Sequence, residues 1–165
     1  PRNAQWHGDL ARLHALAGRY DEALSSLQRA LALAPGNRRT TTDLADVFER
    51  SGRHQEAWAR LQPLVDAGDI DEDMAPVAMR LLDHAGDTAR AIALARAVLE
   101  QPSANDRAQR FLLQQLGRLL EKSGDAAGAF AAFAQAQRTE RHRFDPEAHV
   151  RQVDAHAVVA GHLAE

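Results

Sequence analysis

The chain has 165 residues, of which 45% are hydrophobic, 26% charged and only 5% aromatic. Its formal charge of −3, with both signs interspersed, excludes a strong general attraction to nucleic acid. The absence of cysteine excludes disulfide and thiol chemistry, and no apolar run approaches the roughly 20 residues of a membrane span. We therefore expect a cytoplasmic protein without membrane contact.

Amphipathic stretches with helical spacing predict a succession of helix pairs. In chain order the pairs are 4–17 with 21–34, 38–51 with 55–66, 73–85 with 89–101, and 105–122 with 126–141, followed by a last helix near 146–163. Pro76 fits the first turn of its helix, whereas Pro63 predicts a kink or an early end of the fourth helix.

The sequence repeats itself with a period of 34. Gly18, Gly52 and Gly86 follow one another at this interval, and Gly124 comes four positions later than the interval requires. Each glycine lies in a short loop between two helices, where it can end the first helix in a left-handed conformation. We place the four extra residues before the last glycine in the turn-rich segment 101–106, where they should slightly change the angle between repeats three and four.

Each predicted helix carries apolar columns that recur from repeat to repeat. Offsets of four and three positions trace one helical face. The second helices begin this face with Ala23, Ala57, Ala91 and Ala129, and the first helices carry a column of Ala11, Ala45, Met79 and Gly117, mostly small residues that permit close helix approach. The column of Leu24, Trp58, Ile92 and Phe130 predicts packing between neighbouring repeats, and His54, in the place of Tyr20, predicts packing in a loop.

These features resemble the tetratricopeptide repeat family. The resemblance rests on the period of 34, the Leu116-Gly117 pair, the loop from Gly18 to Ala23 and the helix ending from Ala30 to Pro35. It implies an all-α fold, a right-handed α-solenoid of about four helix–turn–helix repeats with a C-terminal capping helix. We expect residues 1–141 to form the array and residues 142–165 to form the capping or linker helix.

Both ends of the chain carry sequence features that suggest a longer parent protein. Pro1 and Asn3 precede Pro35 and Asn37 by one full period, which predicts an array truncated at its amino-terminal end, although a trimmed disordered leader is the alternative. The segment from Arg143 to Asp154 resembles the junction of bacterial sulfotransferases that carry such repeats. That resemblance implies an alternative function, an amino-terminal arm that positions an acceptor or mediates dimerisation, with a sulfotransferase domain beyond Glu165 in a parent that uses 3′-phosphoadenosine 5′-phosphosulfate.

Catalytic signatures are absent from the sequence. There is no phosphate-binding loop, no dinucleotide-binding glycine motif and no nucleophile elbow. His149 and His156, like His7 and His14, are seven positions apart rather than the four typical of helical metal pairs. We therefore expect no catalysis, no cofactor and no metal site.

The resemblance also implies where a partner binds, because in this family the first helix of each repeat lines the concave surface. We predict a groove for a peptide or partner protein, or alternatively a solvated, salt-bridged helix face. A homodimer through the uncovered amino-terminal face is a further possibility. The predicted groove residues are Gln5, Arg12, Asp46, Glu49, Arg80, Asp83, Gln114, Arg118 and Glu121.

Overall fold

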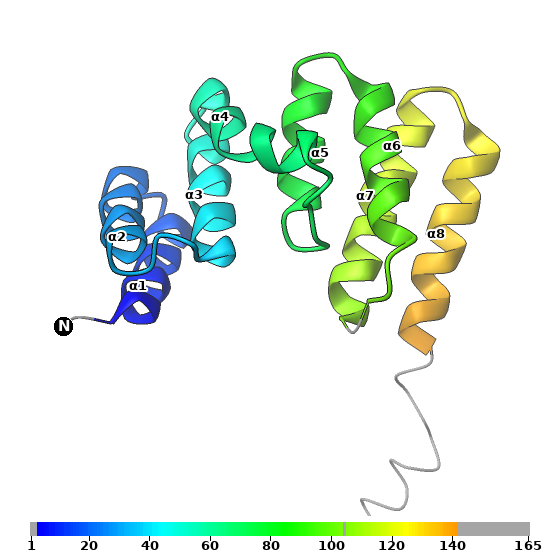
Figure 1. The fold of residues 1–165 in the computed structure, drawn as a ribbon. Helices are drawn as coiled ribbons and strands as arrows, with labels where there is room; N and C mark the ends of the chain where they lie inside the picture. Colours follow the sequence, from blue (N-terminus) through cyan, green and yellow to red (C-terminus); the bar gives the residue numbers. More distant parts are fainter. Residues whose placement is uncertain (1–2, 104, 142–165) are drawn as a thin grey trace, which may run out of the picture.

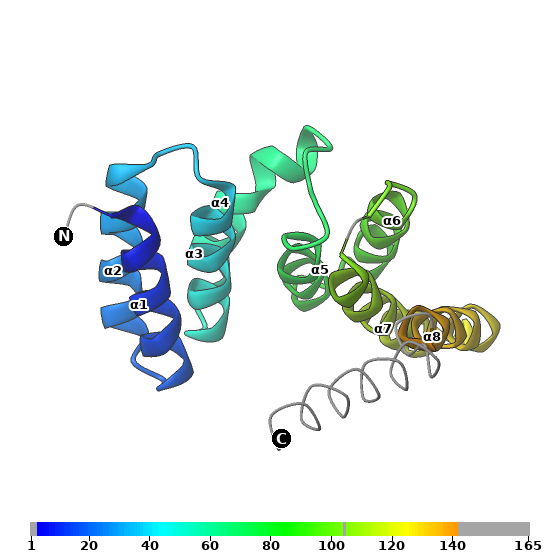
Figure 2. The same ribbon diagram turned by 90° about the horizontal axis from the view of Figure 1, so that it is seen from below.

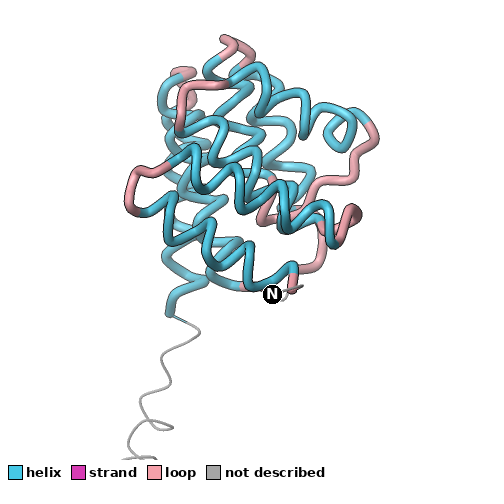
Figure 3. Tube along the Cα trace, turned by 90° about the vertical axis from the view of Figure 1, so that its left-hand side faces the viewer, coloured by secondary structure: helices cyan, strands magenta, loops and turns pink. Residues whose placement is uncertain are grey.

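The computed structural model describes residues 3–103 and 105–141, which contain eight α-helices and no strand (Figure 3). The helices stand in chain order as antiparallel pairs (Figure 1). The all-α solenoid is therefore confirmed, and the capping helix predicted near 146–163 lies outside the described residues. The pairs are α1 (Ala4–Leu16) with α2 (Tyr20–Leu33), α3 (Arg38–Arg50) with α4 (His54–Asp66), α5 (Ala75–His84) with α6 (Thr88–Leu99), and α7 (Asp106–Lys122) with α8 (Ala126–Arg141).

The turn inside each pair has the predicted glycine-ended geometry. The residue after the glycine donates its backbone N–H to a carbonyl five positions earlier, as Arg19 does to His14 at 2.9 Å and Arg53 to Phe48 at 2.8 Å. The glycine itself takes a positive φ, which a residue with Cβ adopts only at a cost. The four values are 73° at Gly18, 79° at Gly52, 84° at Gly86 and 86° at Gly124.

Every first helix is preceded by an Asn or Asp whose side-chain oxygen accepts backbone N–H groups of residues just after it; for α1, α3 and α7 these lie in the first turn, and for α5 in the turn before the helix. Asn3 accepts from Gln5 and Trp6, and Asn37 from Thr40. Asp71 accepts from Asp73 and Met74, and Asn105 from Ala108. Such caps fix where a helix can start. Because the four capping residues follow one another at exact intervals of the repeat, they place all four first helices in the same register.

The four extra residues of the last repeat lie inside α7, so their predicted place in segment 101–106 is wrong. Asn105 keeps the spacing of the repeat, and α7 then runs for 17 residues where α1 and α3 have 13. Four residues are close to one helical turn, so the insertion lengthens the helix without rotating its buried face. The turn-forming composition of 101–106 gave a misleading signal.

Helix α4 and the segment after it differ from the prediction. The helix continues through Pro63 to Asp66, so it does not end early there. A glycine-ended turn follows it, in which Gly68 has φ of 69° and the Asp69 backbone N–H is bonded to the Leu64 carbonyl at 2.8 Å. The linker 67–74 is therefore longer than 34–37 after α2, and it arches from α4 to α5 (Figure 2).

The apolar columns form two core clusters that meet in the middle of the array. The alanines that begin the apolar face of the second helices are all buried, between 0% and 4% exposed. Trp58, Leu64, Val65 and Leu94 pack against both clusters, so the predicted packing of Trp58 between repeats is confirmed. Gly117 is buried in α7, facing the ring of Phe133 in α8.

The close approach of α7 and α8 predicts that Gly117 tolerates no side chain. A Cβ on Gly117 would lie 2.5–2.8 Å from ring carbons of Phe133, so Gly117→Ala should lower the free energy of unfolding by about 1–3 kcal/mol, measured by urea denaturation. Gly8→Ala in α1 is the matched control, because nothing lies within 4 Å of its Cβ. That change should raise stability by about 0.5–1 kcal/mol, and equal effects at the two positions would contradict the packing described for α7.

Candidate functional site

Five of the nine predicted groove residues take part in ion pairs between first helices. Arg80 in α5 donates to Asp46 at 2.6 Å and to Glu49 at 2.9 Å, both in α3. Arg12 in α1 and Asp83 in α5 are the other two, and each meets a residue of the next repeat. The remaining four, Gln5, Gln114, Arg118 and Glu121, are exposed.

One bridge of this kind spans each junction between repeats. Arg12 reaches Asp43 of α3 at 3.5 Å, and Lys122 of α7 reaches Asp83 of α5 at 2.8 Å. Asp43 and Lys122 were missed by the sequence reasoning. Opposite charges spaced by about one repeat on the first helices could have identified them, since stacking brings such positions together.

The pKa values of two carboxylates in these bridges, Asp43 and Asp83, are shifted in opposite directions. Burial raises the pKa of Asp43 above its ordinary value, although the guanidinium of Arg12 opposes this. Hydrogen bonds from Lys122 and then Thr88 lower the pKa of Asp83. Ionised Asp43 therefore opposes folding, whereas ionised Asp83 favours it.

A groove of about 750 Å³ lies where α3, the linker and α5 face the start of α7. Its lining combines five carboxylates and three arginines with one large apolar ring, that of Phe111, which is 44% exposed. Two of the predicted residues, Asp46 and Arg80, contribute to it. The lining residues are Arg38, Arg39, Thr42, Asp43, Asp46, Asp71, Glu72, Asp73, Pro76, Val77, Arg80, Asn105, Ala108 and Phe111.

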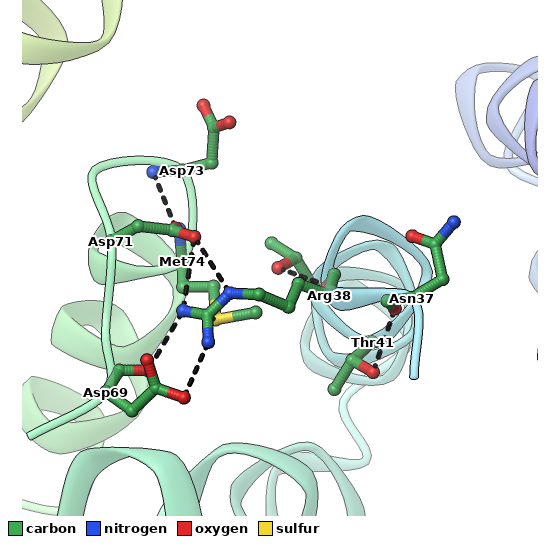
Figure 4. Close-up of polar contacts among 8 residues, drawn as sticks. Asn37, Arg38, Thr41, Asp69, Asp71, Asp73 and Met74 are labelled. Carbon is green, nitrogen blue, oxygen red and sulfur yellow. Dashed lines mark hydrogen bonds and ion pairs between the residues drawn. The ribbon is translucent and has the colours of Figure 1, made fainter. Parts of the chain in front are cut away.

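One wall of the groove is held by Arg38, the first residue of α3. Its guanidinium donates to Asp69 at 2.6 Å and to Asp71 at 3.2 Å, and also to the Asp69 backbone carbonyl at 3.0 Å (Figure 4). The same Asp71 side chain caps the start of the next first helix through its other oxygen. Arg38 thereby ties the linker, and the beginning of the third repeat, to the second repeat.

The outer face of α1 is apolar and exposed. Leu13 is 63% exposed, whereas its equivalents one and two repeats later, Val47 and Leu81, are only 3% and 4% exposed. Trp6 is 48% exposed on the same helix. Homodimerisation through this face remains a prediction.

The histidines of the described residues do not form a metal site. Within residues 3–103 and 105–141, no group of three or more His, Asp or Glu side chains is placed to bind a metal ion. His54 and His84 stack, with ring centroids 3.9 Å apart and planes inclined by 32°, and His149 and His156 lie outside the described residues. None of the helices in the described part of the chain is long and apolar enough to cross a membrane.

Comparison with known families decides the identity of the repeat. Residues 14–77 match the family model described as tetratricopeptide repeat. Within residues 14–77 the repeat is therefore of the tetratricopeptide type. The match covers the end of α1, all of α2, α3 and α4, and the first residues of α5. No curated protein matches the chain.

Solved structures share the fold of this tetratricopeptide array. One titled "Crystal structure of MamA" is 20% identical with a TM-score of 0.65, over 87% of this chain and 81% of its own. MamA 41-end from Desulfovibrio magneticus RS-1 is 16% identical with a TM-score of 0.66, over 87% and 79%. BtubC from P. vanneervenii is 21% identical with a TM-score of 0.57, over 85% and 64%. At these identities the likeness concerns the fold alone.

The sulfotransferase resemblance gains no support. Its residues, 143–154, lie outside the described part of the chain, and neither the family match nor the structures named above point to such an enzyme.

The opposite pKa shifts of Asp43 and Asp83 predict opposite pH dependences. Asp43→Asn should raise the melting temperature at pH 7, because the neutral amide avoids burying a charge, and the gain should vanish as pH falls below the raised pKa. Asp83→Asn should lower the melting temperature at pH 7, and this loss should shrink once pH falls below the ordinary value of 3.8 and through the depressed pKa. Melting curves from pH 7 to pH 2.5 measure both; shifts of the same sign at pH 7 would contradict the assignment.

The Arg38 contacts predict a local effect on the linker. Arg38→Leu should reduce stability by about 1 kcal/mol, since the pairs are partly exposed, and should speed amide hydrogen exchange between Asp69 and Met74. Arg39→Leu on the next residue of α3 is the control, because Arg39 makes none of these contacts. Equal exchange rates in the two variants would show that Arg38 does not hold the linker.

Proposed function

We propose that this chain is a non-catalytic scaffold that binds a segment of a partner protein in the groove between α3, α5 and α7. The tetratricopeptide fold supports the general role, since stacked repeats present side chains from several helices on one continuous surface. The groove, at about 750 Å³, supports the location, because binding clefts typically measure roughly 300–1,000 Å³.

The charge of the lining favours a basic segment. Five carboxylates face three arginines, and two of those arginines, Arg38 and Arg80, already form ion pairs with carboxylates. Glu72 and Asp73 lie on the linker at the edge of the groove, where a lysine or arginine of a partner can reach them. The ring of Phe111 offers an apolar contact at the other wall.

Labelled 12-residue peptides of net charge +4, 0 and −4 test this function, with binding followed by fluorescence anisotropy. The +4 peptides should bind most tightly, and more weakly at higher salt, because the attraction is electrostatic. Glu72→Lys should weaken their binding about fivefold, equivalent to about 1 kcal/mol. Phe111→Ala should weaken it further without changing its salt dependence.

Glu100→Lys is the control, since it makes the same charge change on an exposed residue directly after α6 that does not line the groove. Arg80 is a poor choice for reversal, because its loss would also break the bridges to α3. Peptide binding that is indifferent to charge, or equally weakened by Glu100→Lys, would reject the groove as the binding site.

A further inference from the structure

A second cavity, of about 790 Å³, opens between repeats two and three near their hairpin turns. It is lined by the start of α4, the end of α5 and the start of α6, and it shares no lining residue with the groove described above. Its function is therefore separable from that of the groove. The residues that matter for the argument are His54, Trp58, Leu81, Leu82, His84 and Arg90.

Comparison with the first junction explains why there is space here. The equivalents of His54 and His84 one repeat earlier are Tyr20 and Arg50, and they fill that junction, with the Arg50 guanidinium carbon 5.8 Å from the Tyr20 ring centroid. Leu82 likewise stands where the first junction has Phe48. At these three places a smaller side chain replaces a larger one, and the cavity lies beside them, although Trp58 and Leu81 are larger than their equivalents Leu24 and Val47.

The lining is largely apolar and aromatic. Leu81 and Leu82 are each only 4% exposed and form an apolar base. The stacked imidazoles of His54 and His84 and the indole of Trp58 add flat aromatic surfaces. Aromatic rings bind well against such surfaces in offset or edge-to-face arrangements.

Arg90 is the group at the rim that favours an anion. It lies over Trp58, its guanidinium carbon 5.6 Å from the ring centroid, whereas Arg53, which also lines the cavity, is paired with the lining carboxylate of Glu56. Arg90 pairs with Asp66 at 2.6 Å, but both side chains are about half exposed, so the pair contributes little and a ligand can compete with it. Asp87, the carboxylate nearest in sequence, is already bonded to the Arg90 backbone N–H at 3.1 Å.

We propose that this cavity is a binding site for a small planar aromatic carboxylate. The ring lies on the apolar and aromatic lining, and the carboxylate pairs with the guanidinium of Arg90, which can donate two parallel hydrogen bonds. The site lies between two repeats, so an occupant contacts α4, α5 and α6 together.

The two tryptophans make the test specific, because Trp58 lines the cavity and Trp6 lies on α1 at the end of the array. The full chain is titrated with 2-naphthoate, and the two indole N–H resonances are followed by NMR. The Trp58 resonance should shift saturably while that of Trp6 stays fixed. The neutral isostere 2-naphthamide should bind about tenfold more weakly, since it lacks the charge.

Arg90→Met should weaken 2-naphthoate about tenfold and leave 2-naphthamide unchanged, which would also show that the cavity remains intact in the variant. Arg96→Met, at an exposed position of the same helix outside the cavity, is the control and should change neither affinity. The proposal is overturned if Trp58 gives no saturable shift, if both tryptophans respond alike, or if the acid and the amide bind equally well.

Discussion

Each helical hairpin of this chain has an apolar face that only a neighbouring hairpin can cover. The hairpins must therefore stack for the chain to fold, and the stacking determines which side chains of neighbouring repeats meet. The alanines at the start of the second helices, such as Ala57 and Ala91, are completely buried and leave room for the next helix. An Asn or Asp recurs at the same point of each repeat before the first helix and bonds to the backbone that follows it, and equivalent polar residues of these helices fall into line on one side of the array.

The three junctions between repeats share this plan but differ in detail. Each is spanned by an ion pair between first helices, yet the junction between repeats two and three has a longer linker and smaller side chains. Both large openings of the described structure lie at this junction, the groove on the side of the first helices and the cavity near the hairpin turns. Arg38 sets the geometry there by holding the linker against α3. A departure from the regular repeat thus coincides with the two openings that we propose as binding sites.

Local signals in the sequence predicted most of the fold. Helix bounds, hairpin glycines and most of the buried columns follow from spacing that stays within a repeat, and these were confirmed; the packing between repeats predicted for Phe130 was wrong, because this side chain is 76% exposed. The insertion in α7 was misplaced because a full extra turn leaves the helical pattern intact, so the sequence contains no local sign of it. Pro63 does not end α4, which continues to Asp66 and is followed by the positive-φ Gly68, so the early end was wrong and the kink stays a prediction.

The candidate sites were less predictable, because they depend on contacts between repeats. Arg80 was identified as a groove residue, but its pairing with Asp46 and Glu49 depends on how far α5 is offset along α3. The cavity arises from the side chains missing at His54, Leu82 and His84 by comparison with the first junction. The sequence shows that these side chains are smaller, but only the stacked repeats show that a cavity lies beside them.

The stacking can be tested through Lys122, the only lysine of the chain, whose ammonium nitrogen lies 2.8 Å from both carboxylate oxygens of Asp83 in the preceding repeat. A zero-length carbodiimide joins an amine to a carboxylate in direct contact, and mass spectrometry of the digested monomer identifies the partner. The account predicts one dominant intramolecular link, Lys122 to Asp83, which Lys122→Arg abolishes. Links from Lys122 only to Glu121 or Asp125, its neighbours in sequence, would show that the third and fourth repeats do not stack in the register described.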